Sequence, residues 1–187
     1  MRYAAFMRAL NVGGHTVKMD ALKTIFVKLG YANVESFIAS GNIVFETPSK
    51  TAAAHEKKIA AALERTLGYE VVTFLRNSVE LTEIAAHVPF KGLDDAPTFV
   101  VGFLAAPLPA AATKQLLGLA SRADRFHVRG REIWWHSTNS QADSTFSNKV
   151  LEKTLGVRTT FRNVRTIRKM AVRWGVGLTS AALKPQP

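Results

Sequence analysis

The 187-residue sequence contains no cysteine, which excludes disulfide bonds, thiolate metal sites and a cysteine nucleophile. It also lacks any run of about 20 uncharged apolar residues, the length that spans a bilayer. Residues 1–10 have neither the long apolar core nor the small-residue cleavage site of a signal peptide. The apolar content of 47% is too high for an intrinsically disordered chain. We therefore expect a packed cytoplasmic protein without a membrane span.

Common catalytic patterns are missing as well. Neither GxSxG nor GxxxxGK[ST] occurs, so the sequence lacks the signatures of a nucleophile elbow and of a P-loop. Acidic residues are scattered, and no carboxylate pair stands out. The histidines do not have the spacing of a metal site: His15, His55, His87, His127 and His136. The sequence therefore assigns no catalytic residue, no metal site and no cofactor.

Acidic residues are scarce towards the C-terminus. The chain has 25 Lys and Arg against 14 Asp and Glu, a formal net charge of +11. Residues 1–94 hold 11 basic and 9 acidic residues, whereas residues 95–187 hold 14 basic and 5 acidic ones. No acidic residue follows Glu152. This asymmetry is typical of a surface that faces an anionic partner.

Hydrophobic periodicity and turn residues predict the same order of elements twice. In the first half we expect helices at 20–29 and 51–67 and strands at 3–10, 34–39, 43–46 and 70–76. In the second half we expect helices at 78–87, 109–119, 146–155 and 164–174, and strands at 98–105, 125–128, 132–136 and 159–163. The order β-α-β-β-α-β is that of the ferredoxin-like motif. We predict an α+β fold of two ferredoxin-like halves from a duplication, residues 1–77 and 78–187, which form one compact unit and end in a basic amphipathic helix.

Two loops of the first half are candidate ligand sites. Residues 8–14 (RALNVGG) follow the first strand, where paired glycines can turn backbone N–H groups towards an anion. Arg8, His15 and Lys18 add positive charge there. Residues 40–42 (SGN) join the second strand to the third. We favour a simpler interpretation of both loops as tight turns, because Gly and Asn adopt positive φ angles at low cost.

The last predicted helix has an apolar face and a basic face. The apolar residues are Val164, Ile167, Met170, Ala171 and Trp174, and the basic ones are Arg165, Arg168, Lys169 and Arg173. Two interpretations are evenly balanced: a docked helix with a solvated outer face, or a surface that binds phosphate or nucleic acid. A membrane-surface helix is a third interpretation with less support.

Basic residues also flank two adjacent tryptophans, in Arg129-Gly130-Arg131 and Trp134-Trp135. Neighbouring residues of a strand point to opposite faces, so one tryptophan must point away from the core. It could stack on a base at the surface. We favour instead that it packs against the other half of the molecule.

Three ordered motifs resemble a bacterial family catalogued as domain of unknown function 1697. They are YAAFMRALNVGGHTVKM, SFIASGNIVF and LGVRTTFRNVRTIRKM. The sequence departs from the family pattern at Ala9, where Gly is usual, at Ala39, where Gln is frequent, and at Val164, where Trp is usual. The resemblance covers nearly the whole chain and implies an α+β fold of two ferredoxin-like halves, without an established activity.

We expect a protein that binds a nucleic acid or a phosphorylated ligand through its basic C-terminal half. The candidate ligand-binding residues are Arg8, Asn11, Gly13, Gly14, Lys18, Ser40, Gly41, Asn42, Arg162, Asn163, Thr166 and Lys169. The candidate nucleic-acid surface comprises Arg158, Arg162, Arg165, Arg168, Lys169 and Arg173. One alternative is a small enzyme for a phosphate or acyl-phosphate substrate, since acylphosphatases use an Arg and an Asn in a similar fold. The other is a structural or protein-interaction module.

Overall fold

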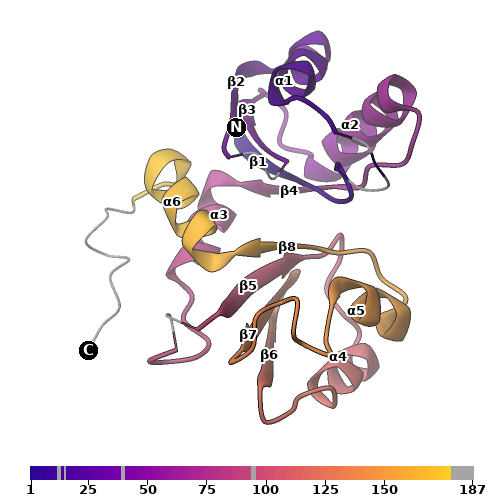
Figure 1. Cartoon of the computed structure of the whole chain (residues 1–187). Coiled ribbons are helices and arrows are strands. Elements are labelled where there is room, and N and C mark those ends of the chain that lie inside the picture. The colour runs from indigo at the N-terminus through magenta and orange to yellow at the C-terminus, as the bar shows by residue number, and fades with distance from the viewer. Residues whose placement is uncertain (12–13, 15, 39–40, 94–95, 178–187) are drawn as a thin grey trace. The chain divides into compact units, whose positions relative to one another are not determined.

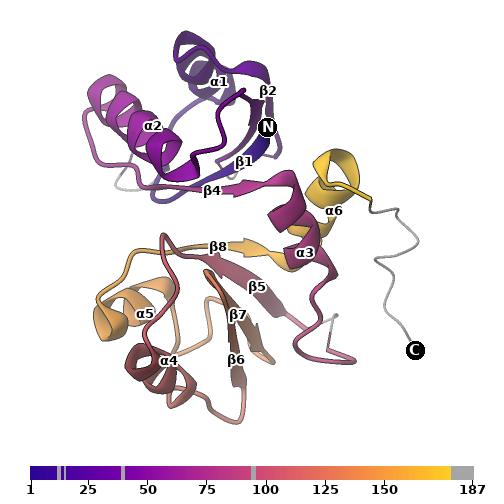
Figure 2. The ribbon, with the colours of Figure 1, turned by 180° about the vertical axis from the view of Figure 1, so that it is seen from behind.

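A computed structural model describes residues 1–11, 14, 16–38, 41–93 and 96–177. These residues form six helices and two four-stranded antiparallel sheets (Figures 1 and 2). The chain divides into two compact units, residues 1–83 with 170–177 and residues 84–169. The predicted α+β class is confirmed.

The first sheet has the strand order β2-β3-β1-β4. Its elements, in chain order, are β1 (Arg2–Met7), α1 (Met19–Lys28), β2 (Ala32–Ser36), β3 (Asn42–Glu46), α2 (Ala52–Leu67) and β4 (Thr73–Asn77). Helix α3 (Ser78–Ala86) follows β4 directly. Helices α1 and α2 cover the same face of this sheet (Figure 1).

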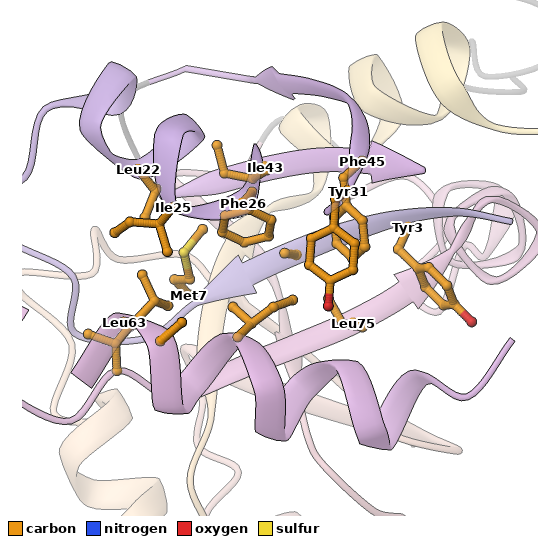
Figure 3. Packing of buried hydrophobic residues seen from close by; sticks show 14 of the residues in the cluster. Tyr3, Met7, Leu22, Ile25, Phe26, Tyr31, Ile43, Phe45, Leu63 and Leu75 are labelled. Carbon is orange, nitrogen blue, oxygen red and sulfur yellow. The ribbon is translucent and has the colours of Figure 1, made fainter. Parts of the chain in front are cut away.

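The first core lies between that face and the two helices (Figure 3). Alternate residues of β1, Tyr3 and Met7 among them, point into it, as the period of two in a strand requires. Phe26 of α1 and Leu63 of α2 meet them from the helical side. Burying each such large apolar side chain stabilises the fold by roughly 1.5–3 kcal/mol. The amphipathic pattern of α1 and α2 therefore fixes which side of each helix packs against the sheet.

The second sheet has the strand order β6-β7-β5-β8. Its elements are β5 (Thr98–Phe103), α4 (Ala110–Leu117), β6 (Asp124–Arg129), β7 (Glu132–Ser137), α5 (Asn148–Leu155) and β8 (Thr160–Asn163). Helix α6 (Val164–Trp174) follows β8 directly. Trp135 anchors the second core, where its ring contacts Phe146 and its Nε1–H donates to Asp124 Oδ1 at 2.9 Å.

The two sheets share one register around their central strands. In the first sheet, Tyr3 of β1 pairs with Phe45 on one side and with Asn77 on the other. In the second, Val100 of β5 pairs in the same way with Trp135 and Asn163. Strand order and register therefore agree with two similar halves.

Strand ends in the first unit differ from the sequence prediction where the backbone turns sharply. β1 ends at Met7 rather than at residue 10, because Ala9 has a φ of 60°. β2 ends at Ser36 rather than at residue 39, and Ile38 has a φ of 50°. Both φ values lie in the left-handed region, which is incompatible with an extended strand.

Candidate functional site

The two candidate loops of the first unit emerge at the same end of its sheet. Phe6 of β1 pairs with Asn42 of β3, so β1 ends where β3 begins. The Met7 N–H donates to the Gly41 carbonyl at 3.1 Å. A Cβ added to Gly41 would lie 3.1 Å from Leu10 Cδ2. The RALNVGG and SGN motifs therefore converge, which sequence alone left open.

Backbone and side-chain hydrogen bonds hold the loop after β1 in place. The Arg8 N–H donates to the Val72 carbonyl at 2.8 Å, and the Tyr69 hydroxyl donates to the Leu10 carbonyl at 2.7 Å. Asn11 uses its side-chain oxygen to accept from the Val17 N–H at 3.0 Å. The amide of Asn11 thus closes the loop on itself.

Two basic residues of this loop lie among the described residues, Arg8 and Lys18, whereas His15 lies outside them. Arg8 is half-buried, whereas Asn11, Gly14 and Lys18 are exposed. Gly14 has a φ of 84°, which glycine adopts without steric cost. Gly13 belongs to the same candidate set but lies outside the described residues.

Asn42 stabilises the connection between β2 and β3. Its side chain is fully buried, and its Nδ2 donates to the Phe37 carbonyl at 3.1 Å. The Phe37 N–H in turn donates to the Asn42 carbonyl at 3.0 Å. Ser40, the remaining member of the SGN turn, lies outside the described residues. The described part of the motif therefore serves the fold.

The Arg-Asn pair at the end of β8 recurs at the end of β4, a repeat that sequence reasoning missed. Asn163 Oδ1 accepts from the Arg165 N–H at 2.8 Å and caps α6. Asn77 Oδ1 accepts from two N–H groups of α3, at 2.9 and 3.0 Å. Its sequence signal is the short match between FLRN at 74–77 and TFRN at 160–163.

The arginine of each pair is buried. Arg162 Nη1 donates to Thr160 Oγ1 at 2.7 Å and to the Phe161 carbonyl at 2.9 Å. Arg76 Nη1 makes the same backward bond to the Leu75 carbonyl at 2.7 Å. Burial lowers the pKa of Arg162 to about 10, so it keeps its proton at neutral pH. The candidate residue Arg162 lies in the interior and does not contribute to a basic surface.

The remaining candidates near the C-terminus lie around α6. The predicted apolar face is buried throughout: Val164, Ile167, Met170, Ala171 and Trp174. The exposed candidates are Arg158, Asn163, Arg165, Lys169 and Arg173, while Thr166 and Arg168 are half-buried. Arg165, Lys169 and Arg173 are spaced four residues apart, so they form one stripe along the helix.

Within the first unit, the end of α6 contacts β2 and the residue after it. The guanidinium of Arg173 pairs with the Glu35 carboxylate, and Trp174 Nε1 donates to the same carboxylate at 3.1 Å. The Trp174 ring meets the Phe37 ring edge to face, with centroids 5.3 Å apart. The last turn of the helix therefore lies beside the strand that leads into the SGN motif.

Neither tryptophan of the second sheet is exposed. Trp135 lies in the second core, between the sheet and helices α4 and α5. Trp134 points to the opposite face of the sheet and is 1% exposed. Trp134 contacts the rings of His87 and His127. The exposed stacking surface considered from the sequence is therefore absent from the described part of the second unit.

The part of the chain that the structure describes has no helix long and apolar enough to cross a bilayer. The same residues contain no group of three or more His, Asp or Glu placed to hold a metal ion.

Residues 1–134 match the family described as a protein of unknown function, DUF1697. The chain belongs to this family. The third motif, in residues 155–170, lies beyond the matched region. A solved structure, described as that of the conserved bacterial protein SP0830 from Streptococcus pneumoniae, has a similar fold with a TM-score of 0.68 and 22% sequence identity. The similarity covers 92% of this chain and 97% of that one. No curated protein matches the sequence.

Proposed function

We propose that this DUF1697 protein binds nucleic acid through the exposed basic stripe of α6, Arg165, Lys169 and Arg173, together with Arg158. The observation that carries the proposal is that the opposite face of the helix is buried while these four residues are exposed. The stripe extends about 12 Å at 1.5 Å per residue, which suits a polyanion better than a single phosphate.

The charge balance near α6 supports the same proposal. No acidic residue follows Glu152 in the sequence, so α6 itself carries basic side chains and no carboxylate. Arg173 is partly neutralised by Glu35 of β2. Since exposed ion pairs contribute only about 0–1 kcal/mol, a phosphate can displace this carboxylate at small cost.

The test measures the binding of single-stranded and duplex oligonucleotides by fluorescence anisotropy between 50 and 200 mM salt. We expect affinity to fall steeply with salt, because each neutralised phosphate releases counterions. The variant Arg165→Gln/Lys169→Gln should reduce the slope of log K against log salt by roughly 1.4–1.8, the amount expected for two phosphate contacts. The control Lys57→Gln/Lys114→Gln removes the same charge from exposed positions elsewhere and should leave the slope close to that of the native protein.

Two outcomes would contradict the proposal. One is the absence of binding to either oligonucleotide at 50 mM salt. The other is an equal loss in the two double variants, which would show that net charge alone attracts the nucleic acid. Binding of a nucleoside triphosphate but of no oligonucleotide would indicate a phosphorylated small ligand instead.

The small-enzyme alternative has weaker support. It relies on Arg8, Asn11 and Asn42 as ligand-facing groups at the end of β1. The Asn11 amide accepts from the Val17 N–H, and the Asn42 amide donates to a backbone carbonyl. Side chains committed to loop closure are poorly placed to polarise a substrate. An Arg8→Ala variant with unchanged turnover of an acyl phosphate would count against this alternative.

We also propose that the two halves are ferredoxin-like units that arose by duplication. The shared strand order, the shared register and the repeated Arg-Asn pair support this. We further propose a cytoplasmic location, with which a sequence free of cysteine is compatible.

A further inference from the structure

A short segment of the second unit, residues 87–90, lies across the face of the sheet opposite α4 and α5. We name these residues the strap. The His87 ring lies 4.9 Å from the His127 ring and 4.6 Å from the Trp134 ring. The Phe90 ring lies 6.1 Å from Phe99. Both ends of the strap are thus held by ring contacts.

Histidines take part in the contacts at both ends of the strap. The His87 ring lies tilted against the His127 ring, and Phe90 contacts His136 with ring centroids 5.7 Å apart. His136 is buried, while His87 and His127 are half-buried. The His87 end therefore contains two histidines in contact, and the Phe90 end contains one.

The hydrogen bond between Arg129 and His87 requires a neutral His87 side chain. Arg129 Nη1 lies 3.3 Å from His87 Nδ1. A guanidinium only donates, so Nδ1 must accept and His87 must be neutral. Adding a proton at Nδ1 places two donors face to face and brings two positive charges together. Protonation thus removes the contact and replaces it with repulsion.

Burial and most neighbouring charges lower the pKa values of these histidines. Burial lowers the pKa of His87, of His127 and of His136. Arg129 lowers the first two further, and Arg125 lowers the third, whereas Asp124 opposes the shift at His136. Other charged residues near these histidines include Glu83 and Lys91, which precede and follow the strap in the sequence, Glu132 opposite Arg129 in the register, and Arg162 on β8 of the same sheet.

We propose that residues 87–90 form an acid-released strap: protonation of His87 and His127 detaches His87 from Trp134 and uncovers this face of the second sheet. The cause is repulsion among His87, His127 and Arg129 together with loss of the Arg129 bond. Four buried ring nitrogens of this face have no hydrogen-bond partner among the described residues, namely His87 Nε2, Trp134 Nε1 and both nitrogens of His136. These groups gain hydration when the strap opens, which favours release. Release of the strap involves none of the residues of the proposed nucleic-acid site.

The experiment uses the full chain labelled with 5-fluorotryptophan and follows each tryptophan by ¹⁹F NMR from pH 7.5 to 5.0. Resonances are assigned with Trp→Phe variants. We expect the Trp134 resonance to move with a midpoint below 6.5, while Trp135, in the helix-side core, keeps its native shift. A Trp134 resonance that does not move in this range overturns the proposal, and so does a simultaneous change at Trp135, which would report global unfolding.

Variants separate the strap from general acid sensitivity. His87→Gln/His127→Gln should lose the Trp134 transition, whereas His55→Gln, which removes a buried histidine of the first unit, should keep it. Arg129→Gln retains both histidines and should raise the midpoint by about half a pH unit, the effect of one nearby charge in a largely aqueous setting. A transition that persists in the double variant, or an Arg129→Gln midpoint that is unchanged or lower, overturns the proposal.

Discussion

The positive φ angle of Ala9 can be tested through its effect on protein stability. Ala9 has a φ of 60°, in the left-handed region that costs an L-residue about 1–2 kcal/mol. Glycine avoids this cost but loses about 0.5–1 kcal/mol through its larger unfolded-state freedom. Ala9→Gly should therefore stabilise the protein by about 0.5–1 kcal/mol.

Urea unfolding followed by circular dichroism measures the effect, and thermal unfolding should show a rise of about 1–4 °C. Ala61→Gly is the matched control, because Ala61 is exposed within α2. There the same substitution should destabilise the protein by about 1 kcal/mol. Equal destabilisation by the two substitutions would refute the reasoning, because it would mean that residue 9 bears no left-handed strain.

Three further tests address the sheet, a helix cap and the first core. Gly102→Ala should destabilise the protein by about 1–3 kcal/mol in urea unfolding, because the new Cβ would lie 2.6 Å from Phe161 Cε1. An unchanged urea midpoint would show instead that the Phe161 ring moves aside freely. Asn163→Ala should cost about 1 kcal/mol in thermal unfolding by removing the cap on the Arg165 N–H, and Asn163→Asp should restore most of it. Burial lowers the pKa of His55 below its usual 6.5, so the folded state favours the neutral imidazole. The unfolded state therefore binds a proton more readily as the pH falls from 6.5, and the stability that neutral His55 contributes is lost. The free energy of unfolding should therefore fall less between pH 7 and 5 in His55→Gln than in the native protein, and an equal fall would contradict this.

Periodicity predicted most of the architecture because each helix buries one regular face. The apolar positions assigned to the last helix, from Val164 to Trp174, are all buried. Strand ends were less predictable, because they depend on single backbone angles such as those of Ala9 and Ile38. Neither residue type favours a positive φ, so the sequence carries no local signal for these turns.

The candidate sites were predictable as motifs but not as surfaces. The sequence identified Arg162 as basic, but it could not show that β8 turns this side chain into the interior, where it bonds to Thr160 and the Phe161 carbonyl. It placed Asn42 in a turn but could not show that its amide bonds to Phe37. Contacts between residues distant in sequence, such as Arg173 with Glu35, depend on tertiary packing and carry no periodic signal.

The Arg-Asn pairs give corresponding positions in the two halves, and the positions at which the halves differ are candidates for a function of one half alone. The buried and capping positions agree, since Arg76 corresponds to Arg162 and Asn77 to Asn163. The helices that follow differ at their outward positions: VELTE at 79–83 corresponds to RTIRK at 165–169. Glu83 thus corresponds to Lys169. The Arg-Asn pair thus occupies the same place in both sheets, whereas the basic residues of α6 have no basic counterpart in α3. Arg165 and Lys169 are exposed and their counterparts Val79 and Glu83 are not basic, so binding experiments should begin with these two residues of α6.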